Sequence, residues 1–198
     1  MSNTLSISYR IGSVLVLAAF YAFYLGKSFS QKKHGIKTNQ MAKGKEKGRT
    51  YYIELLLGVA TTVIIPVQIA SIVCGYSLMG MHAKLTGLCL GFIGVVFFAV
   101  SSITMKNSWR AGIPQEDKTE FVTDGIYKWS RNPAFLGFDM MYLGILIMYL
   151  NPVLAFFTVW AMLMLHLQIL EEEKFLAKRF GTDYENYRKH VFRYLGRK

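Results

Sequence analysis

The chain has 198 residues, of which 53% are hydrophobic and only 18% are charged. Together with a mean hydropathy of +0.28, this composition excludes an ordinary soluble domain and indicates an integral membrane protein. The net charge of +11 does not indicate nucleic-acid binding, because the basic residues form no motif interleaved with aromatic side chains. Attraction to anionic lipid headgroups explains this charge more simply.

Five apolar segments follow one another along the chain, and each approaches the ~20 residues with which a helix crosses a bilayer. They cover residues 11–25, 51–74, 85–105, 134–150 and 153–170. We therefore predict an all-α fold for an integral membrane protein. It is a single membrane domain over residues 1–198, with about five transmembrane helices and a C-terminal cytoplasmic helical segment.

The distribution of basic residues gives this topology an orientation. With five spans, 21 of the 23 Lys and Arg residues fall on one face, and only Arg10 and Lys84 fall on the other. The 21 lie in the segments 27–49, 106–131 and 174–198. Since Lys and Arg stay on the cytoplasmic side of short loops, the N-terminus is expected outside and the tail inside. A cleaved signal peptide is the alternative for the first span, but the basic residues follow that run instead of preceding it.

Two features near the second span have plain interpretations. The loop over residues 30–49, within the basic segment 27–49, is rich in Lys, contains scattered Gly and has no apolar period, so we expect it to be mobile and to lack a fixed structure. Glu54 lies within a turn of the basic end of the span, where its carboxylate can reach water. We interpret it as an interfacial residue.

The pair Asn132-Pro133 predicts the start of the fourth helix. Asn132 is suited to cap the helix, and Pro133 suits the first helical position, where its missing N–H costs nothing. The mouth of the helix still offers free N–H groups and a partial positive charge that can receive a carboxylate. Arg131 adjoins it and can form a charge-assisted pair with the same anion.

Asp139 lies about two turns inside the fourth span. Ionisable residues at such positions are functional or paired with another side chain. We expect its partner to be His166 or Gln168 on the fifth span.

Asn151-Pro152 separates the fourth and fifth spans by only two residues, which predicts an antiparallel helical hairpin. The start of the fourth helix and the cluster 171–173, three consecutive glutamates, should therefore lie close together. Three carboxylates at the negative end of a helix are unfavourable. Either the neighbouring Lys174, Lys178 and Arg179 or a bound ammonium group could compensate them.

Phe180-Gly181 predicts a helix end, followed by a new helix from Thr182 or Asp183. In the new helix, Tyr184 and Tyr187 are three residues apart and share one face.

These motifs resemble those of the membrane-embedded methyltransferase superfamily that includes isoprenylcysteine carboxyl methyltransferase and the phospholipid N-methyltransferases. The resemblance covers residues 107–193, the expected cofactor-binding half. The family pattern joins G-x-Y/F-x-x-x-R-H-P-x-Y-x-G, a helical hairpin, E-E-x-x-L and F-G-x-x-Y-x-x-Y. The matching residues are Gly125, Tyr127, Arg131, Pro133, Gly137, Glu172, Glu173, Leu176, Phe180, Gly181, Tyr184 and Tyr187.

The resemblance implies an enzyme that uses S-adenosyl-L-methionine, needs no metal, and methylates a hydrophobic or lipid-like small molecule within membrane lipids. The residues that it implies for the cofactor are Trp109, Tyr127, Arg131, Asn132, Phe135, Gly137, Glu172 and Glu173. It implies a catalytic role for Glu172 and Arg131. We expect Gln168, His166 and Asp139 to contact the methyl acceptor.

Three departures from the family pattern bear on the acceptor and the source. Asn132 stands in place of the usual His and Phe135 in place of Tyr, a version that resembles a bacterial variant and implies the plasma (inner) membrane of a prokaryote. Carboxyl methyltransferases of the family carry an Arg where this chain has Gln168. The acceptor is therefore open between a carboxylate, as in isoprenylcysteine methylation, and a phospholipid or other amine.

Two other classes of protein remain as alternatives. Sterol reductases have a related C-terminal helical arrangement that binds a nicotinamide cofactor, so an NADPH-dependent membrane reductase is one of them. A non-catalytic scaffold or transporter is the other, and the buried position of Asp139 is its one positive argument.

Overall fold

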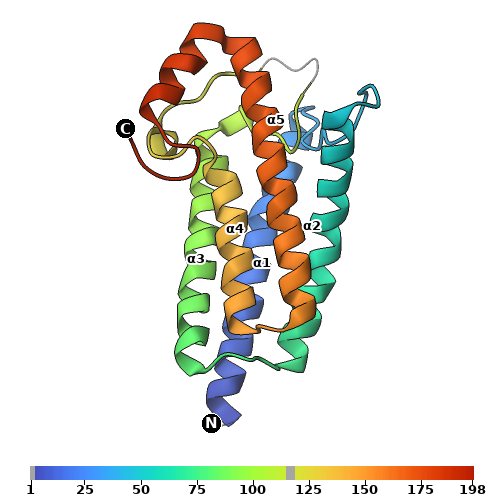
Figure 1. The fold of residues 1–198 in the computed structure, drawn as a ribbon, viewed down its shortest axis with the longest axis vertical. Coiled ribbons are helices and arrows are strands. Elements are labelled where there is room, and N and C mark those ends of the chain that lie inside the picture. Colours follow the sequence, from blue (N-terminus) through green and yellow to red (C-terminus); the bar gives the residue numbers. More distant parts are fainter. Residues whose placement is uncertain (1–2, 115–118) are drawn as a thin grey trace.

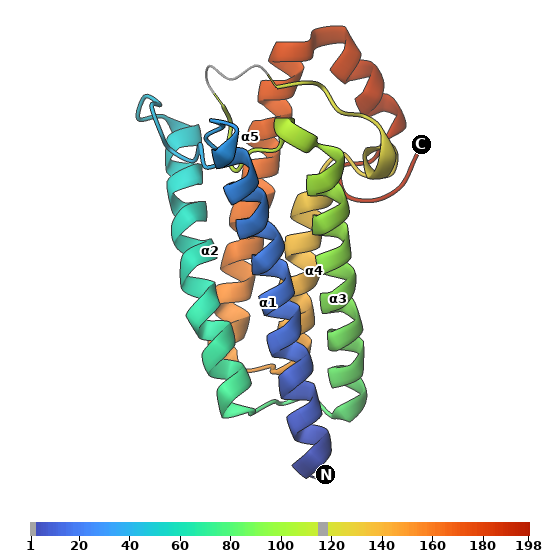
Figure 2. The same ribbon diagram turned by 180° about the vertical axis from the view of Figure 1, so that it is seen from behind.

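A computed structural model describes residues 3–114 and 119–198, and in this part of the chain helices are the regular elements. The five α-helices run side by side as one bundle (Figures 1 and 2). They are α1 (Asn3–Lys33), α2 (Arg49–Cys74), α3 (Met81–Thr104), α4 (Pro133–Met148) and α5 (Pro152–His190), with the short 3₁₀ turns η1 (Lys106–Ser108) and η2 (Gly125–Lys128) between α3 and α4. The predicted all-α class is confirmed.

Four of these helices, α1, α2, α3 and α5, are long and apolar enough to cross a membrane. The remaining predicted span, residues 134–150, corresponds to α4, an apolar helix of 16 residues that is shorter than the other four. At 1.5 Å per residue it is about 24 Å long, which is less than the ~30 Å hydrocarbon core of a bilayer. The N-terminus of α4 lies well below the level that α5 reaches (Figure 1). The mouth of α4 is therefore sunk within the bundle.

The three basic segments lie at one end of the bundle, where the loop after α1, the turns before α4 and the tail after α5 meet (Figure 1). Lys118, which belongs to the second segment, is outside the described residues. The two basic residues of the opposite end have local partners. The Arg10 guanidinium lies at Gly75, which ends α2, and Lys84 Nζ lies 5.6 Å from the centre of the Tyr149 ring. Packing thus accounts for both exceptions to the charge asymmetry.

α3 and α4 form the closest pair of helices because glycines face each other across their contact. Gly87, Gly91 and Gly94 recur at helical spacing on α3, and they meet Gly137 and Gly144 of α4. A Cβ atom built on Gly144 would lie 2.6 Å from the carbonyl oxygen of Gly87. Small residues of this kind let two helix backbones approach in a membrane, where lipid is as apolar as a leucine side chain.

Replacing Gly144 by alanine should therefore force α3 and α4 apart. We expect a loss of about 1–3 kcal/mol in unfolding free energy, the usual range for overpacking, measured as a lower midpoint of thermal unfolding in detergent. Gly26→Ala is the matched control, because nothing lies within 4 Å of a Cβ atom there. Equal midpoints for the two variants would contradict this account of the contact.

The predicted hairpin between α4 and α5 is confirmed. Asn151 caps α5 by accepting a hydrogen bond from the Leu154 N–H at 2.9 Å, and Pro152 occupies the first turn. The predicted break after Phe180 is also confirmed, because Gly181 has φ 49° and ψ −121°, which are not helical angles. The chain then turns away from the bundle axis, and residues 182–190 cross its upper end (Figure 1).

The prediction that the loop after α1 lacks a fixed structure is wrong. The Gln40 N–H donates to the Ala111 carbonyl at 2.8 Å, and the Ala111 N–H donates to the Thr38 carbonyl at 3.0 Å. The buried Gln31 side chain, at the end of α1, donates to the carbonyl of Trp109 at 2.8 Å. The loop is thus joined by backbone hydrogen bonds to the segment that follows α3.

Candidate active site

The mouth of α4 is held by a clamp around Glu173. This carboxylate accepts hydrogen bonds from Arg131 at 2.8 and 3.2 Å, from Arg193 at 2.9 and 3.1 Å, and from the Asn132 amide at 3.2 Å. The hydrogen bonds to Glu173 raise the pKa of the Arg193 guanidinium. Arg131 also donates to the Val191 carbonyl at 2.8 Å, so the clamp fastens the C-terminal tail onto the start of α4.

The three consecutive glutamates of α5 separate into three environments. Glu171 pairs with Lys174 at 2.8 Å and accepts a hydrogen bond from the Thr50 hydroxyl at 2.7 Å. Glu173 belongs to the clamp. Glu172 is half-buried, and its hydrogen-bond partner is the neutral amide of Gln168 at 3.0 Å. Local cations therefore compensate the first and third carboxylates, whereas Glu172 stays available to a cationic ligand.

The interpretation of Glu54 as an interfacial residue is wrong, because this residue is fully buried. Its carboxylate accepts the N–H of Ala42 at 2.7 Å, the N–H of Ile113 at 2.9 Å and the Gln168 amide at 3.4 Å, and it pairs with Lys45. Glu54 thus joins the loop after α1, the segment after α3 and α5. The same Gln168 amide connects it to Glu172.

Removing the negative charge of Glu54 should release the loop after α1. Glu54→Gln replaces an oxygen that accepts backbone N–H groups by an amide donor, and we expect a loss of about 2–4 kcal/mol in unfolding free energy. Trypsin should then cut faster after Lys43 and Lys47. The matched control is Glu46→Gln in the same loop, where the side chain is exposed. Equal cleavage rates for the two variants would show that Glu54 does not hold the loop.

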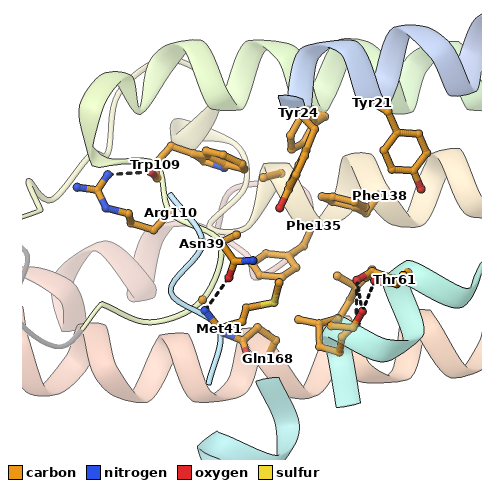
Figure 3. A pocket seen from close by; sticks show the side chains of 18 of the residues that line it. Tyr21, Tyr24, Asn39, Met41, Thr61, Trp109, Arg110, Phe135, Phe138 and Gln168 are labelled. Carbon is orange, nitrogen blue, oxygen red and sulfur yellow. Dashed lines mark hydrogen bonds between the residues drawn. The ribbon is translucent and has the colours of Figure 1, made fainter. Parts of the chain in front are cut away.

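Two adjoining cavities lie behind these contacts. The larger has a volume of about 450 Å³ and the smaller about 120 Å³. Figure 3 shows the larger one, between α1, α2, α4 and α5. Six residues line both cavities, namely Trp109, Arg110, Gly112, Ala134, Phe135 and Glu172. A ligand in each cavity would therefore meet the other at Glu172 and the first turn of α4.

The smaller cavity combines aromatic rings with polar groups. Tyr127, Tyr184 and Tyr187 line it together with Arg131 and Asn132. Burial raises the pKa of the Tyr127 phenol, which stays protonated at neutral pH. The Tyr187 hydroxyl donates to the carbonyl of Tyr127 at 2.6 Å and so fixes η2 against the segment after Gly181.

The first turn of α4 offers two backbone donors at this junction. No side chain caps the helix, and within the described residues no hydrogen bond involves the N–H of Ala134 or Phe135. These two N–H groups and the partial positive charge of the helix end favour an anion. The clamp adds to this positive charge, because it holds two guanidinium groups against one carboxylate.

The larger cavity has mostly apolar walls, formed by side chains such as Leu57, Ile65, Phe98 and Phe138. It reaches the outer surface between α1 and α2, because Leu25 and Thr62 line it and are themselves exposed. Gly112 closes its other side with φ +90°, and a Cβ atom there would lie 2.7 Å from the Met41 nitrogen. The docked loop thus forms one wall of the cavity.

Most of the side chains predicted for the cofactor lie together. Six of the predicted residues line the smaller cavity, namely Trp109, Tyr127, Arg131, Asn132, Phe135 and Glu172. Gln168 lines the larger one. Two other predicted cofactor residues line neither cavity, since Gly137 packs against α3 and Glu173 belongs to the clamp.

The predicted partners of Asp139 are corrected. His166 Nδ1 is hydrogen-bonded to the Tyr194 hydroxyl, and Gln168 is bonded to the two glutamates Glu54 and Glu172. Asp139 is buried, and its Oδ1 atom has no hydrogen-bond partner among the described residues. Neither Asp139 nor His166 lines the two cavities.

Several residues that line the cavities carry no motif. They include Asn39 and Met41 from the loop, Tyr21 and Tyr24 from α1 and Thr61 from α2. The spacing of the two tyrosines places them on one helix face, which was a usable signal. The loop residues gave none, because their position depends on the hydrogen bonds to Ala111.

A helical hairpin, a cationic helix mouth and two joined cavities that meet at Glu172 define a membrane-embedded helical protein with an internal site. The model of the phospholipid methyltransferase family matches residues 71–183, which is more than half of the chain. The chain therefore belongs to this family.

The relatives that the chain matches are named protein-S-isoprenylcysteine O-methyltransferases. The protein of Saccharomyces cerevisiae is 27% identical over 121 residues, which are 59% of this chain and 50% of the relative. A probable enzyme of this name from Oryza sativa subsp. indica is 32% identical over 108 residues, 53% of this chain and 56% of the relative. The Homo sapiens protein is 29% identical over 113 residues, 54% and 39% of the two chains. The chain thus spans about half the length of the curated relatives, or less.

Proposed function

We propose that this protein is an S-adenosyl-L-methionine-dependent methyltransferase that acts on a hydrophobic, lipid-like acceptor. The observation that carries the proposal is the meeting of a polar, aromatic cavity and an apolar cavity at Glu172. Such a junction suits a reaction between a water-soluble donor and an acceptor from the bilayer. The names of the relatives favour O-methylation of a prenylcysteine-like acid over N-methylation of a phospholipid.

The residues of the smaller cavity fit the methyl donor, which carries an α-carboxylate, an ammonium and a sulfonium group. The free N–H groups of Ala134 and Phe135 and the excess positive charge of the clamp would hold the carboxylate. Glu172 would receive a cationic group, and the rings of Trp109 and Tyr127 would enclose the rest. Bound there, the donor supplies an electrophilic methyl group.

In this proposal the protein contributes alignment and exclusion of water. Gln168 holds the Glu172 carboxylate from one side, and Trp109 and Phe135 separate the junction from solvent. Arg131 acts through the mouth of α4, because its guanidinium is bonded to Glu173. A carboxylate acceptor needs no base, since it is ionised at neutral pH. An amine would first lose its proton to a base such as Glu172.

The acceptor would enter from the bilayer between α1 and α2, where the larger cavity reaches the surface. The donor would enter from the end of the bundle that carries the three basic segments, which we propose is the cytoplasmic face of a prokaryotic plasma membrane. Residues 1–198 would act as a single membrane domain, since α1, α2 and the docked loop complete the acceptor cavity that the C-terminal half leaves open.

Purified protein in nanodiscs should retain labelled S-adenosyl-L-methionine saturably and should not retain NADPH. It should then transfer the label to at least one member of a panel that contains S-farnesyl-N-acetylcysteine, phosphatidylethanolamine and a long-chain fatty acid. Retention of NADPH alone would favour a membrane reductase. Retention of neither molecule would favour a scaffold and end the proposal.

A further inference from the structure

Two phenol hydroxyls lie at the inner end of the larger cavity, and an apolar ligand would offer them no hydrogen-bond acceptor. Tyr142 of α4 is fully buried and lines this cavity, as does Tyr21 of α1. Among the described residues neither hydroxyl makes a hydrogen bond of ordinary geometry, and the one hydroxyl that each can reach is the other. Figure 3 shows Tyr21 at the end of the cavity opposite Trp109 and Arg110, which border the smaller cavity. Tyr142 lies seven residues after Phe135 on α4, which is about 10 Å along the helix axis from the first turn where the two cavities meet.

A buried hydroxyl without a partner is costly, and phenylalanine would fill either position without that cost. The two hydroxyls adjoin each other, but mutual bonding could not satisfy both of them. Each phenol has a single O–H donor, so one donor would remain even if the other were used between the rings. The neighbouring Thr61 hydroxyl already donates to the carbonyl of Leu57 at 2.8 Å. The pair therefore presents at least one free donor to the cavity.

We propose that this inner end is a subsite for an oxygen atom in the tail of the acceptor, such as a carbonyl, ether or hydroxyl oxygen. The oxygen accepts a hydrogen bond from the Tyr142 and Tyr21 pair. The acceptor is then polar at two places, at the methylated group and at one position along its tail. The inference rests on the proposed function in one respect, which is that the larger cavity holds the acceptor.

Binding of matched probes to the protein in nanodiscs tests the subsite without methyl transfer. The probes are N-acetylcysteine thioethers with a straight sixteen-carbon tail, either saturated or with one methylene replaced by a keto group at successive positions. We expect one keto position to bind about threefold to tenfold more tightly than the saturated probe, the usual gain from a single hydrogen bond. Tyr142→Phe should weaken this preference, and the double variant with Tyr21→Phe should remove it, while both variants still bind the saturated probe.

Tyr149→Phe is the matched control. Its phenol accepts a hydrogen bond from the Ser13 hydroxyl at 3.0 Å and does not line the cavity. This variant should keep the keto preference and unfold at a lower temperature, whereas Tyr142→Phe without ligand should unfold at the same temperature or a higher one. A lower unfolding temperature for Tyr142→Phe would show that its hydroxyl is satisfied within the protein, and would overturn the subsite.

The subsite also fails if the saturated probe binds as tightly as every keto probe, or if the preference survives in the double variant. The second result would mean that the hydroxyls hold only water. Binding of neither probe would remove both the subsite and the assignment of the cavity. A normal keto preference in a protein that transfers no methyl group would instead contradict the proposed function alone.

Discussion

Glu172→Gln is expected to reduce methyl transfer by about 10²–10³-fold, the loss typical when a preorganised charge is removed from a reacting centre. The carboxylate lies where the two cavities meet, and no cation of the protein pairs with it in the described residues. Removing its charge takes away the electrostatic partner of a cationic donor. The fold should survive, because the new amide oxygen can still accept the hydrogen bond from Gln168. Transfer from labelled S-adenosyl-L-methionine measures the loss.

The adjacent Glu171 provides the control for this substitution. Glu171→Gln changes the same charge on the same helix, but Glu171 lines neither cavity and its pairs with Lys174 and Arg49 involve exposed cations. The Glu171 side chain itself is only 8% exposed, and the new amide oxygen can still accept the hydrogen bond from the Thr50 hydroxyl, so this variant should keep near-normal transfer even if it unfolds at a lower temperature. Undiminished transfer by Glu172→Gln would remove Glu172 from the mechanism.

The local features of the fold could be predicted from the sequence because short signals determine them. The Asn151-Pro152 turn requires a hairpin, and the glycine after Phe180 ends a helix wherever it stands. The hairpin was enough to bring Arg131 to the glutamates of α5, although these lie within the helix, about two turns before its break at Gly181. The predicted proximity of the cationic start of α4 and the glutamates of α5 is confirmed by the 2.8 Å between Arg131 and Glu173, and a ligand site shared by Arg131 and Glu172 stays a prediction.

The partners within that site could not be predicted in the same way. Three adjacent glutamates have the same local sequence context, and partners from other parts of the chain help to distinguish them, such as Arg193 for Glu173 and Thr50 for Glu171. Glu54 and Gln168 are 114 residues apart in the chain, and no periodicity relates them. The bounds of α4, in contrast, agree with the predicted run 134–150 to within two residues at each end, because Asn132-Pro133 starts the helix.

The docked loop shows how far composition alone can mislead. Lysine and glycine predict a chain that buries too little apolar surface to order itself. The loop is nevertheless held, because backbone hydrogen bonds to Ala111 and the buried carboxylate of Glu54 replace apolar burial. Its lysines remain mostly at the surface, and Lys45 is paired with that carboxylate. A segment that contributes no motif therefore forms a wall of the larger cavity.

Glu173→Gln should have the largest effect on stability, because Glu173 is the common acceptor for two arginines. Its side chain is only 9% exposed and that of Arg131 only 7%. Without the carboxylate, two guanidinium groups face each other beside the positive end of α4. Breaking a buried ion pair from one side costs about 3–5 kcal/mol, so thermal unfolding in detergent should occur at a clearly lower temperature. The tail should also become accessible to trypsin after Arg193.

A second substitution separates repulsion from loss of packing. Glu173→Gln combined with Arg193→Gln returns the net charge of the clamp to that of the unsubstituted protein, and it should recover part of the lost unfolding free energy, because the two guanidinium groups no longer repel each other. The surface pair of Glu185 and Arg188, with side chains 43% and 52% exposed, gives the reference. Glu185→Gln should cost less than about 1 kcal/mol. If Glu173→Gln cost no more than Glu185→Gln, the mouth of α4 would be held by its packing against α3, and the clamp would be incidental to the site.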